Sequence, residues 1–313
     1  MKILFLWTGI TRCAGDCWRA LSRRSGVELK IVIDEASPDA ALEREVLGGL
    51  DYSFAENGRL PDFAGWTPDV LFAVGWHAKA VREGVLCEEW GRVPKVLCFD
   101  MPWRWSLRCF AARFVLWRYC RRFSAAYVPG ASTARYARWL GFSRATPGFL
   151  AIDLRRFAPS SVPSEKRRGF LYVGRRSREK RLDLIERAYG RYRELGGKWP
   201  IGYHHDTPYS GMPAVYARSA CLVLASEHDA WPLVALEAKA SGCDVILSDR
   251  CGNRMDLATR VVPFGDVEAL AREMLAAERG ESAPPAQDLS FWDCNAWAAR
   301  ALAMAKEVTK WEG

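Results

Sequence analysis

The chain has 313 residues, more than a single hydrophobic core usually accommodates, so its length favours two domains. Apolar and aromatic residues make up 50% of the sequence and charged residues 26%, a globular balance that excludes wholesale disorder and collagen-like sequence. The formal net charge of +8 favours an anionic partner, which could be a phosphorylated ligand, a membrane surface or a nucleic acid.

Membrane spans, disulfides and metal sites are not expected. The apolar runs are shorter than the roughly 20 residues that a span needs. The apolar start at residues 2–7 is too short for a signal peptide, so we expect a first strand there and a cytoplasmic protein. The ten cysteines are scattered without a CxxC pair, and the four histidines form no HExxH pattern. Buried free thiols and no metal site are therefore predicted.

Strand-like and helix-like stretches alternate along the first half of the chain. Strands are predicted at residues 2–7, 28–33, 69–74, 95–99 and 125–128, and helices at residues 16–24, 106–122 and 132–140. This alternation is typical of a doubly wound parallel sheet.

The same pattern restarts in the second half of the chain. Strands are predicted at residues 170–173, 220–224, 244–247 and 261–263, with a helix from about residue 179 to residue 195. The polar segment 158–168 separates the halves. A last helix is predicted from Ser290, as its N-cap, with Asp293 completing a capping box. We therefore predict two Rossmann-like α/β domains in tandem, residues 1–158 and residues 159–289, and a helix at 290–313 that packs back towards the first domain.

A cluster of cations follows the predicted strand 170–173. Gly174 allows a ligand to approach the backbone, and five cations follow within seven residues: Arg175, Arg176, Arg178, Lys180 and Arg181. Cations at a helix start oppose the helix dipole and one another, which favours a bound anion. The fork of arginine and the point charge of lysine suit a diphosphate. A solvated basic loop is the alternative.

Two carboxylates mark the segment that follows strand 220–224. Asp229 precedes a helix whose start Pro232 fixes, and Glu237 lies eight residues later on an otherwise apolar helix. A buried carboxylate needs a partner, so this pair could bind hydroxyls of a ribose and a sugar. Two ordinary surface acids are the alternative.

Two further candidates follow strands of the first half, where ligands of open α/β sheets bind. Gly9 lies in a turn that matches neither GxGxxG nor the P-loop spacing. Asp100 follows strand 95–99 and could polarise an acceptor hydroxyl or bind a donor sugar. An ordinary βα loop and a helix N-cap are the respective alternatives.

Taken together, these motifs resemble the retaining glycosyltransferases of GT-B fold, specifically glycosyltransferase family 4 (group 1), which use nucleotide-diphosphate sugars. The resemblance implies two Rossmann-like domains with parallel sheets facing across a cleft. Carried over by position, Arg175 and Lys180 would hold the donor diphosphate. Asp229 and Glu237 resemble the two acids of the family's E-x7-E segment, which contact the transferred sugar and the ribose. The implied catalytic residues are Asp100, Arg175, Lys180 and Asp229, and the implied donor-binding residues are Gly9, Gly174, Arg175, Lys180, Asp229, Trp231, Pro232, Leu233 and Glu237.

The resemblance implies transfer of a sugar, with retention, from a nucleotide-diphosphate sugar to a hydroxyl of a glycan or lipid-linked saccharide. It implies no metal and no cofactor besides the nucleotide sugar as co-substrate. Two alternatives stay open. One is a DNA-directed sugar transferase, suggested by the charge. The other is a non-catalytic relative that binds a nucleotide sugar or glycan, suggested by Asp229, which is one methylene shorter than the family's glutamate.

The segment 102–123 interleaves tryptophan and phenylalanine with arginine. This composition suits a membrane interface or a nucleic-acid strand. Because the arginines do not gather on one helical face, a core helix with snorkelling arginines is the favoured interpretation. A lipid-linked acceptor at the inner membrane face, with peripheral contact to an anionic membrane surface, is a hypothesis that this stretch suggests. A nucleic-acid partner is less favoured.

Overall fold

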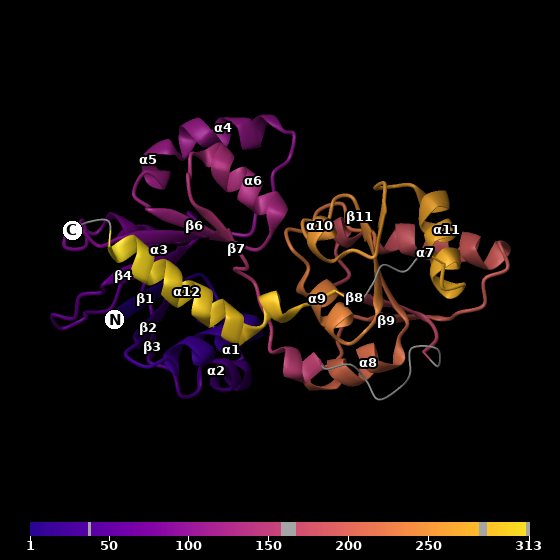
Figure 1. The fold of residues 1–313 in the computed structure, drawn as a ribbon, viewed down its shortest axis with the longest axis horizontal. Coiled ribbons are helices and arrows are strands. Elements are labelled where there is room, and N and C mark those ends of the chain that lie inside the picture. Colours follow the sequence, from indigo (N-terminus) through magenta and orange to yellow (C-terminus); the bar gives the residue numbers. More distant parts are fainter. Residues whose placement is uncertain (37–38, 158–166, 282–286, 311–313) are drawn as a thin grey trace. The chain divides into compact units, whose positions relative to one another are not determined.

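The computed structural model describes residues 1–36, 39–157, 167–281 and 287–310. The chain divides into two compact units (Figure 1). Unit 1 comprises Met1–Asp153 and Ser290–Gly313, and unit 2 comprises Leu154–Leu289. Each unit is built on its own parallel sheet, so the predicted α/β class with two Rossmann-like units is confirmed. Most of the predicted junction, residues 158–166, lies outside the described residues, and the division itself falls after Asp153.

Unit 1 contains a seven-stranded sheet of order β3-β2-β1-β4-β5-β6-β7, and every neighbouring pair is parallel. Its strands are β1 Lys2–Trp7, β2 Glu28–Ile33, β3 Tyr52–Phe54, β4 Val70–Val74, β5 Lys95–Cys98, β6 Ala125–Val128 and β7 Ala145–Pro147. The bounds predicted for β1, β2 and β6 are confirmed. The edge strands β3 and β7 are three residues long and only partly buried, so no apolar run predicts them.

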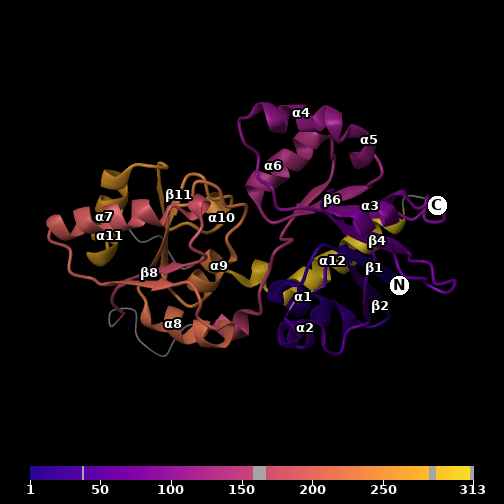
Figure 2. The ribbon, with the colours of Figure 1, turned by 180° about the vertical axis from the view of Figure 1, so that it is seen from behind.

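Two helical layers cover the faces of this sheet (Figures 1 and 2). One core holds Trp18 of α1 and Trp297 of α12 against the sheet. The other holds Val81 of α3, Cys109 of α4 and Tyr136 of α6. The helices of unit 1 are α1 Arg12–Ser22, α2 Ala40–Leu47, α3 Lys79–Leu86, α4 Leu107–Val115, α5 Trp117–Cys120, α6 Ala131–Leu140 and α12 Cys294–Thr309.

The last helix, α12, belongs to unit 1 although it is last in the sequence. Its N-cap is Asp293, whose carboxylate accepts a hydrogen bond from the backbone N–H of Asn295 at 2.8 Å. The prediction of Ser290 as N-cap is wrong, because Ser290 begins a separate 3-10 turn, η5 Ser290–Trp292. Trp297 attaches α12 to the segment that follows β7, since its indole N–H donates a hydrogen bond to the carbonyl of Phe149 at 2.6 Å.

The helix predicted at residues 106–122 is two helices, α4 and α5, which meet at Leu116. The only buried residue of α4 is Cys109, while Leu107, Phe114 and Val115 are exposed. The interpretation of this segment as a core helix is therefore wrong for α4.

Unit 2 contains a five-stranded parallel sheet of order β12-β11-β10-β8-β9. Its strands are β8 Phe170–Val173, β9 Ile201–His204, β10 Cys221–Leu224, β11 Asp244–Ser248 and β12 Arg260–Val262. Its helices are α7 Leu182–Glu194, α8 Met212–Arg218, α9 Leu233–Ala240, α10 Arg254–Leu257 and α11 Val267–Glu278, with 3-10 turns η1 Leu154–Phe157, η3 Arg178–Lys180 and η4 Tyr209–Gly211. Because β8 and β10 are parallel neighbours, the segments that follow them meet at one edge of the sheet, where α/β proteins bind ligands.

Candidate active site

The basic segment after β8 is a 3-10 turn followed by a helix. Arg181 has a left-handed backbone (φ 49°) and separates η3 from α7, which begins at Leu182. The prediction of a helix from residue 179 is therefore early by three residues, and the cations precede the helix. Arg181 is neutralised locally, because its guanidinium donates to both carboxylate oxygens of Asp183 at 2.9 and 2.8 Å.

Arg175 presents its charge to solvent. Its side chain is 83% exposed, and its guanidinium lies 3.9 Å from the carboxylate of Glu179. The backbone before it is fixed by two contacts: the hydroxyl of Tyr172 donates to the Arg175 carbonyl at 3.0 Å, and Gly174 has a φ of 150°, a conformation that favours glycine. The structure therefore holds the Arg175 backbone in place and leaves the guanidinium able to reach an anion.

Lys180 and Asp229 meet at the edge of the sheet. The Nζ of Lys180 donates to Oδ2 of Asp229 at 2.5 Å, and both side chains are largely buried. Lys180 comes from η3 and Asp229 from the loop between β10 and α9. A second bond joins these segments, since the backbone N–H of Glu227 donates to the Glu179 carbonyl at 2.8 Å. The two sequence motifs thus form one local constellation.

The loop that carries Asp229 rests on a close-packed turn after β11. The backbone N–H of Gly252 donates to the Asp229 carbonyl at 2.9 Å. A Cβ at Gly252 would lie 1.7 Å from the carbonyl oxygen of Ala230, so only glycine permits this approach. The turn after β11 therefore fixes the position of the backbone that carries Asp229.

Trp231, Pro232 and Leu233 form the entrance to α9. The indole N–H of Trp231 donates to the carboxylate of Asp256 at 3.1 Å, and the side-chain amide of Asn253 donates to the Pro232 carbonyl at 2.9 Å. Trp231 and Pro232 are buried and Leu233, the first residue of α9, is partly exposed. The first two residues therefore anchor the helix start, and the structure gives them a positioning role.

Glu237 lies in the second turn of α9 and is 6% exposed. The hydroxyl of Tyr216 on α8 donates to Oε2 of Glu237 at 2.7 Å, which supplies the partner that a buried carboxylate needs. Burial raises the pKa of Glu237, and hydrogen bonds from Tyr216 and Tyr209 together with the charge of Arg156 oppose that rise. The two candidate carboxylates of unit 2 thus have different partners: Asp229 is paired with Lys180, and Glu237 with Tyr216.

Gly9 and Asp100 belong to unit 1. Gly9 follows β1 and Asp100 follows β5, and both strands are parallel to β4, which lies between them. The two residues therefore follow strand ends at the same edge of the unit 1 sheet. Asp100 is exposed, and its carbonyl accepts a hydrogen bond from the Thr133 hydroxyl at 3.2 Å. Nothing packs within 4 Å of where a Gly9 Cβ would be.

His205 is a residue of this region that the motifs do not reveal. Its Nδ1 lies 2.9 Å from the Gly174 carbonyl, while its Nε2 is buried without a hydrogen-bond partner among the described residues. A buried polar atom of this kind calls for a partner. The signal that could have found it is the strand β9, which ends at His204 and is not among the predicted strands.

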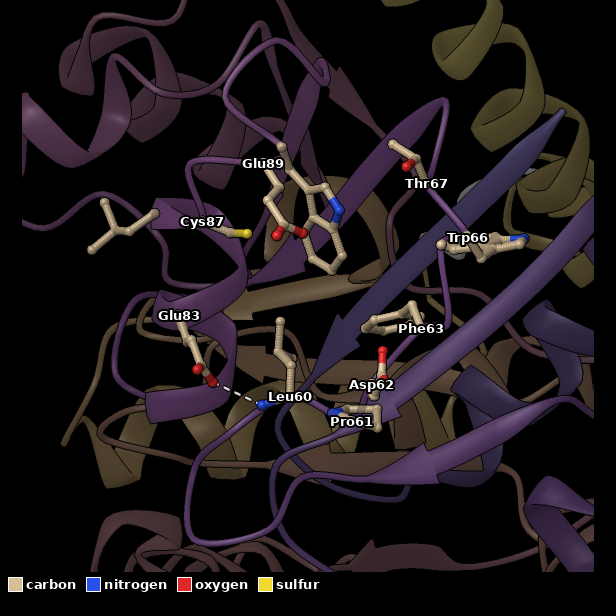
Figure 3. Close-up of a pocket in the computed structure, with 12 residues that line it drawn as sticks. Leu60, Pro61, Asp62, Phe63, Trp66, Thr67, Glu83, Cys87 and Glu89 are labelled. Carbon is tan, nitrogen blue, oxygen red and sulfur yellow. Dashed lines mark hydrogen bonds between the residues drawn. The ribbon is translucent and has the colours of Figure 1, made fainter.

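Unit 1 also contains a pocket of about 500 Å³ between the loop after β3 and helix α3 (Figure 3). Aromatic side chains, including Phe63 and Trp66, share its lining with three carboxylates, Asp62, Glu83 and Glu89. Glu83 is engaged, since it accepts a hydrogen bond from the backbone N–H of Leu60 at 2.7 Å (Figure 3). None of the predicted site residues lines this pocket.

The ten cysteines are free, and eight of them are buried. In the described parts of the chain, one trio of potential metal ligands, Asp153, Asp293 and Cys294, has atoms within 4.8 Å of one another. Asp293 caps α12, and no predicted site residue belongs to the trio. Among the helices of the described residues, none combines the length and apolar character needed to cross a membrane.

Comparison with known proteins points to one family and one fold. Residues 193–289 match the family model described as glycosyl transferases group 1. A search of curated proteins gives no match. The matched residues include Asp229 and Glu237 but begin after Arg175 and Lys180.

Solved structures of very different sequence share the fold. HepE of Anabaena, in complex with UDP and glucose, has a TM-score of 0.71 at 13% identity, covering 98% of this chain and 100% of HepE. Sucrose-phosphate synthase of Thermosynechococcus elongatus has a TM-score of 0.67 at 13% identity, covering 99% and 100%. The catalytic domain of starch synthase IV of Arabidopsis thaliana, bound to ADP and acarbose, has a TM-score of 0.69 at 10% identity, covering 99% of each chain.

The family model and the structures agree with the resemblance that the motifs suggested: the chain has the GT-B fold of two Rossmann-like units, and its second unit carries a group 1 glycosyl transferase segment over residues 193–289.

Proposed function

We propose that the chain transfers a glycosyl group from a nucleotide-diphosphate sugar to a hydroxyl of a glycan or lipid-linked saccharide, with retention of configuration. The observation that carries this proposal is the contact of Lys180 with Asp229, 49 residues apart, at the edge of the unit 2 sheet and just before α9. A cation and a carboxylate meet there, and Asp229 lies within the segment 193–289 that matches the group 1 family.

Each side chain has a role in this proposal. Arg175 and Lys180 neutralise the departing diphosphate, because cations placed where negative charge develops stabilise the transition state. Asp229 accepts hydrogen bonds from hydroxyls of the transferred sugar, and Glu237 accepts them from the ribose. When the donor binds, the hydrogen bond of Lys180 to Asp229 breaks and Lys180 donates to the diphosphate instead. Asp100 and Gly9 are proposed to act from the first unit, on the acceptor and the donor respectively.

Donor binding is the first test. A panel of UDP-, GDP-, ADP-, TDP- and CMP-sugars is compared by thermal shift and calorimetry, beginning with UDP-glucose because HepE was solved with that compound. A donor at about one hundred times its dissociation constant adds about 2.7 kcal/mol to the free energy of unfolding. Lys180→Met should abolish this gain. Arg187→Ala, which removes an exposed cation of α7, is the matched control and should keep it.

Turnover decides between an enzyme and a binding protein. A glycosyltransferase should at least slowly hydrolyse its donor, and NMR of the released sugar should show the anomeric configuration of the donor before mutarotation. Binding of one donor without hydrolysis or transfer would instead favour a non-catalytic relative. A folded protein that binds no UDP-, GDP-, ADP- or TDP-sugar of the panel, or binds only a CMP-sugar, would refute the proposal.

A further inference from the structure

Helix α4 turns an apolar stripe towards solvent. Leu107, Ala111, Phe114 and Val115 have the spacing i, i+4, i+7 and i+8, which places them on one side of a helix. Helices at a protein surface normally pack such a stripe against the core. Here the exposed fractions are 90% for Leu107, 77% for Phe114 and 78% for Val115, and Ala111 is exposed as well.

Two tryptophans extend this stripe at its ends. Trp105, just before α4, is 77% exposed, and Trp117, at the start of α5, is 50% exposed. Isolated exposed apolar residues are common on proteins, whereas a contiguous group marks an interaction surface. We call Trp105, Leu107, Phe114, Val115 and Trp117 the apolar surface of α4–α5.

The segment that carries this surface is strongly basic. Residues 101–152 contain nine arginines and no lysine, aspartate or glutamate, while the whole chain has a formal net charge of +8. Arg108 of α4, Arg118 of α5 and Arg122, just after α5, are exposed. Arginine binds phosphate through two parallel hydrogen bonds, which lysine cannot do. The charge and the residue type therefore both favour a phosphate-bearing partner.

A basic cavity opens beside the apolar surface. It measures about 440 Å³ and is lined by Arg113, Trp117 and Arg121, with Ser124 and Ser143 among its other residues and no carboxylate. Aromatic rings hold both guanidinium groups: that of Arg121 lies 4.9 Å from the ring centroid of Trp117, and that of Arg113 lies 5.5 Å from the ring centroid of Trp139. Arg113 also donates to the Trp139 carbonyl at 2.5 Å. Two arginines are thus held by aromatic rings at one cavity, where both can reach the same anion.

We propose that the apolar surface of α4–α5 and the basic cavity beside it bind an anionic lipid bilayer. Leu107, Phe114 and Val115 enter the boundary between headgroups and acyl chains, where a helix with one apolar side lies in the plane of the interface. Arg113 and Arg121 receive a lipid phosphate in the basic cavity. The exposed arginines around them add electrostatic attraction to the anionic surface.

The residue types distinguish a bilayer from other partners. Single-stranded nucleic acid is bound by aromatic stacking and cations, which leaves the exposed aliphatic side chains Leu107 and Val115 without a role. A second copy of this surface would bring two arginine-rich segments together, and like charges across an interface oppose association. A bilayer supplies both hydrocarbon, which suits the apolar surface of α4–α5, and phosphate, which suits the basic cavity.

The test is flotation of the full chain with vesicles of phosphatidylcholine alone or with about one third phosphatidylglycerol, without nucleotide sugar. The wild type should float with the anionic vesicles only, and added salt should weaken this binding. The variants Leu107→Ala/Phe114→Ala and Arg113→Gln/Arg121→Gln should each lower the partition coefficient at least tenfold, since apolar burial and charge both contribute. The controls Met255→Ala, which shortens an exposed apolar side chain of unit 2, and Arg23→Gln/Arg92→Gln, which removes two exposed cations of unit 1, should not change it.

Each other outcome would overturn the proposal. Absence of binding to anionic vesicles would do so, as would binding that the first two variants leave unchanged in a folded protein, as checked by circular dichroism. A dimer in sedimentation analysis that those variants convert to a monomer would assign the surface to a second copy. Tighter binding to a DNA duplex than to vesicles would assign it to nucleic acid. Because no donor is present, these results stand apart from the test of sugar transfer.

Discussion

Glu237 shows how one buried residue makes stability depend on pH. Burial raises its pKa above the ordinary value of 4.5, so the folded state holds a proton that the unfolded state releases. The folded state binds more protons in this window, and the free energy of unfolding therefore falls as the pH rises from about 4.5 to the raised pKa. Below that window the contribution of Glu237 to stability is fully present.

The variant Glu237→Gln should flatten this part of the pH profile. A glutamine amide does not titrate, and its oxygen can still accept the hydrogen bond from Tyr216, so the change removes the charge and keeps the contact. Urea unfolding measured from acidic to neutral pH gives the two profiles. Burial also raises the pKa of Asp244, so Asp244 changes the free energy of unfolding with pH in the same direction as Glu237. The variant Asp244→Asn, which removes the contribution of Asp244, is the control. Parallel profiles for the wild type and Glu237→Gln would contradict this account.

At the scale of elements, the turn after β11 acts on the candidate site without contributing a ligand. A Cβ at Gly252 would meet the Ala230 backbone at 1.7 Å, so Gly252→Ala must push the loop that carries Asp229. We expect a loss of about 1–3 kcal/mol of stability, as in other overpacked sites, together with weaker donor binding in calorimetry although Lys180 and Asp229 are intact.

Gly190 offers the matched glycine. It lies in α7 with nothing within 4 Å of an added Cβ, so Gly190→Ala should raise the free energy of unfolding by about 0.5–1 kcal/mol and leave donor binding unchanged. Equal donor affinity in Gly252→Ala and the wild type would show that the position of the Asp229 loop does not matter for the donor.

Sequence patterns predict elements that are buried and regular. The apolar runs of β1 and β2 gave their bounds, and Lys180 and Asp229 were both singled out from their motifs. Contacts that depend on tertiary approach leave no such pattern. The role of Gly252 depends on a loop 22 residues earlier in the chain, and the partner of Glu237 is Tyr216 on α8, 21 residues away. The exposure of Leu107 contradicts the ordinary rule for apolar helical spacing, which is why the sequence alone favours a core helix in the segment 102–123.

At the scale of the whole molecule, the chain passes between units twice, after Asp153 and after Leu289. Unit 2 is therefore one continuous segment, whereas unit 1 is assembled from both ends of the chain. Its core includes Trp297, Ala301 and Met304 of α12 together with Phe5 and Trp18. The core of unit 1 thus combines residues from both ends of the chain.

This arrangement predicts how fragments fold. Residues 154–289 should unfold cooperatively in urea as an isolated fragment, because the fragment contains its whole sheet. Residues 1–153 alone should not, since deleting several buried side chains at about 2–5 kcal/mol each exceeds the roughly 5–15 kcal/mol that stabilises a domain.

Joining residues 1–153 to residues 290–313 through a Gly/Ser linker should restore a cooperative transition and the near-ultraviolet circular dichroism of packed aromatic side chains. The same linked fragment with Trp297→Ala should lose about 3–5 kcal/mol, whereas Trp105→Ala, at an exposed position, should lose little. A cooperative transition in residues 1–153 without α12 would show that the core of unit 1 is complete without its last helix.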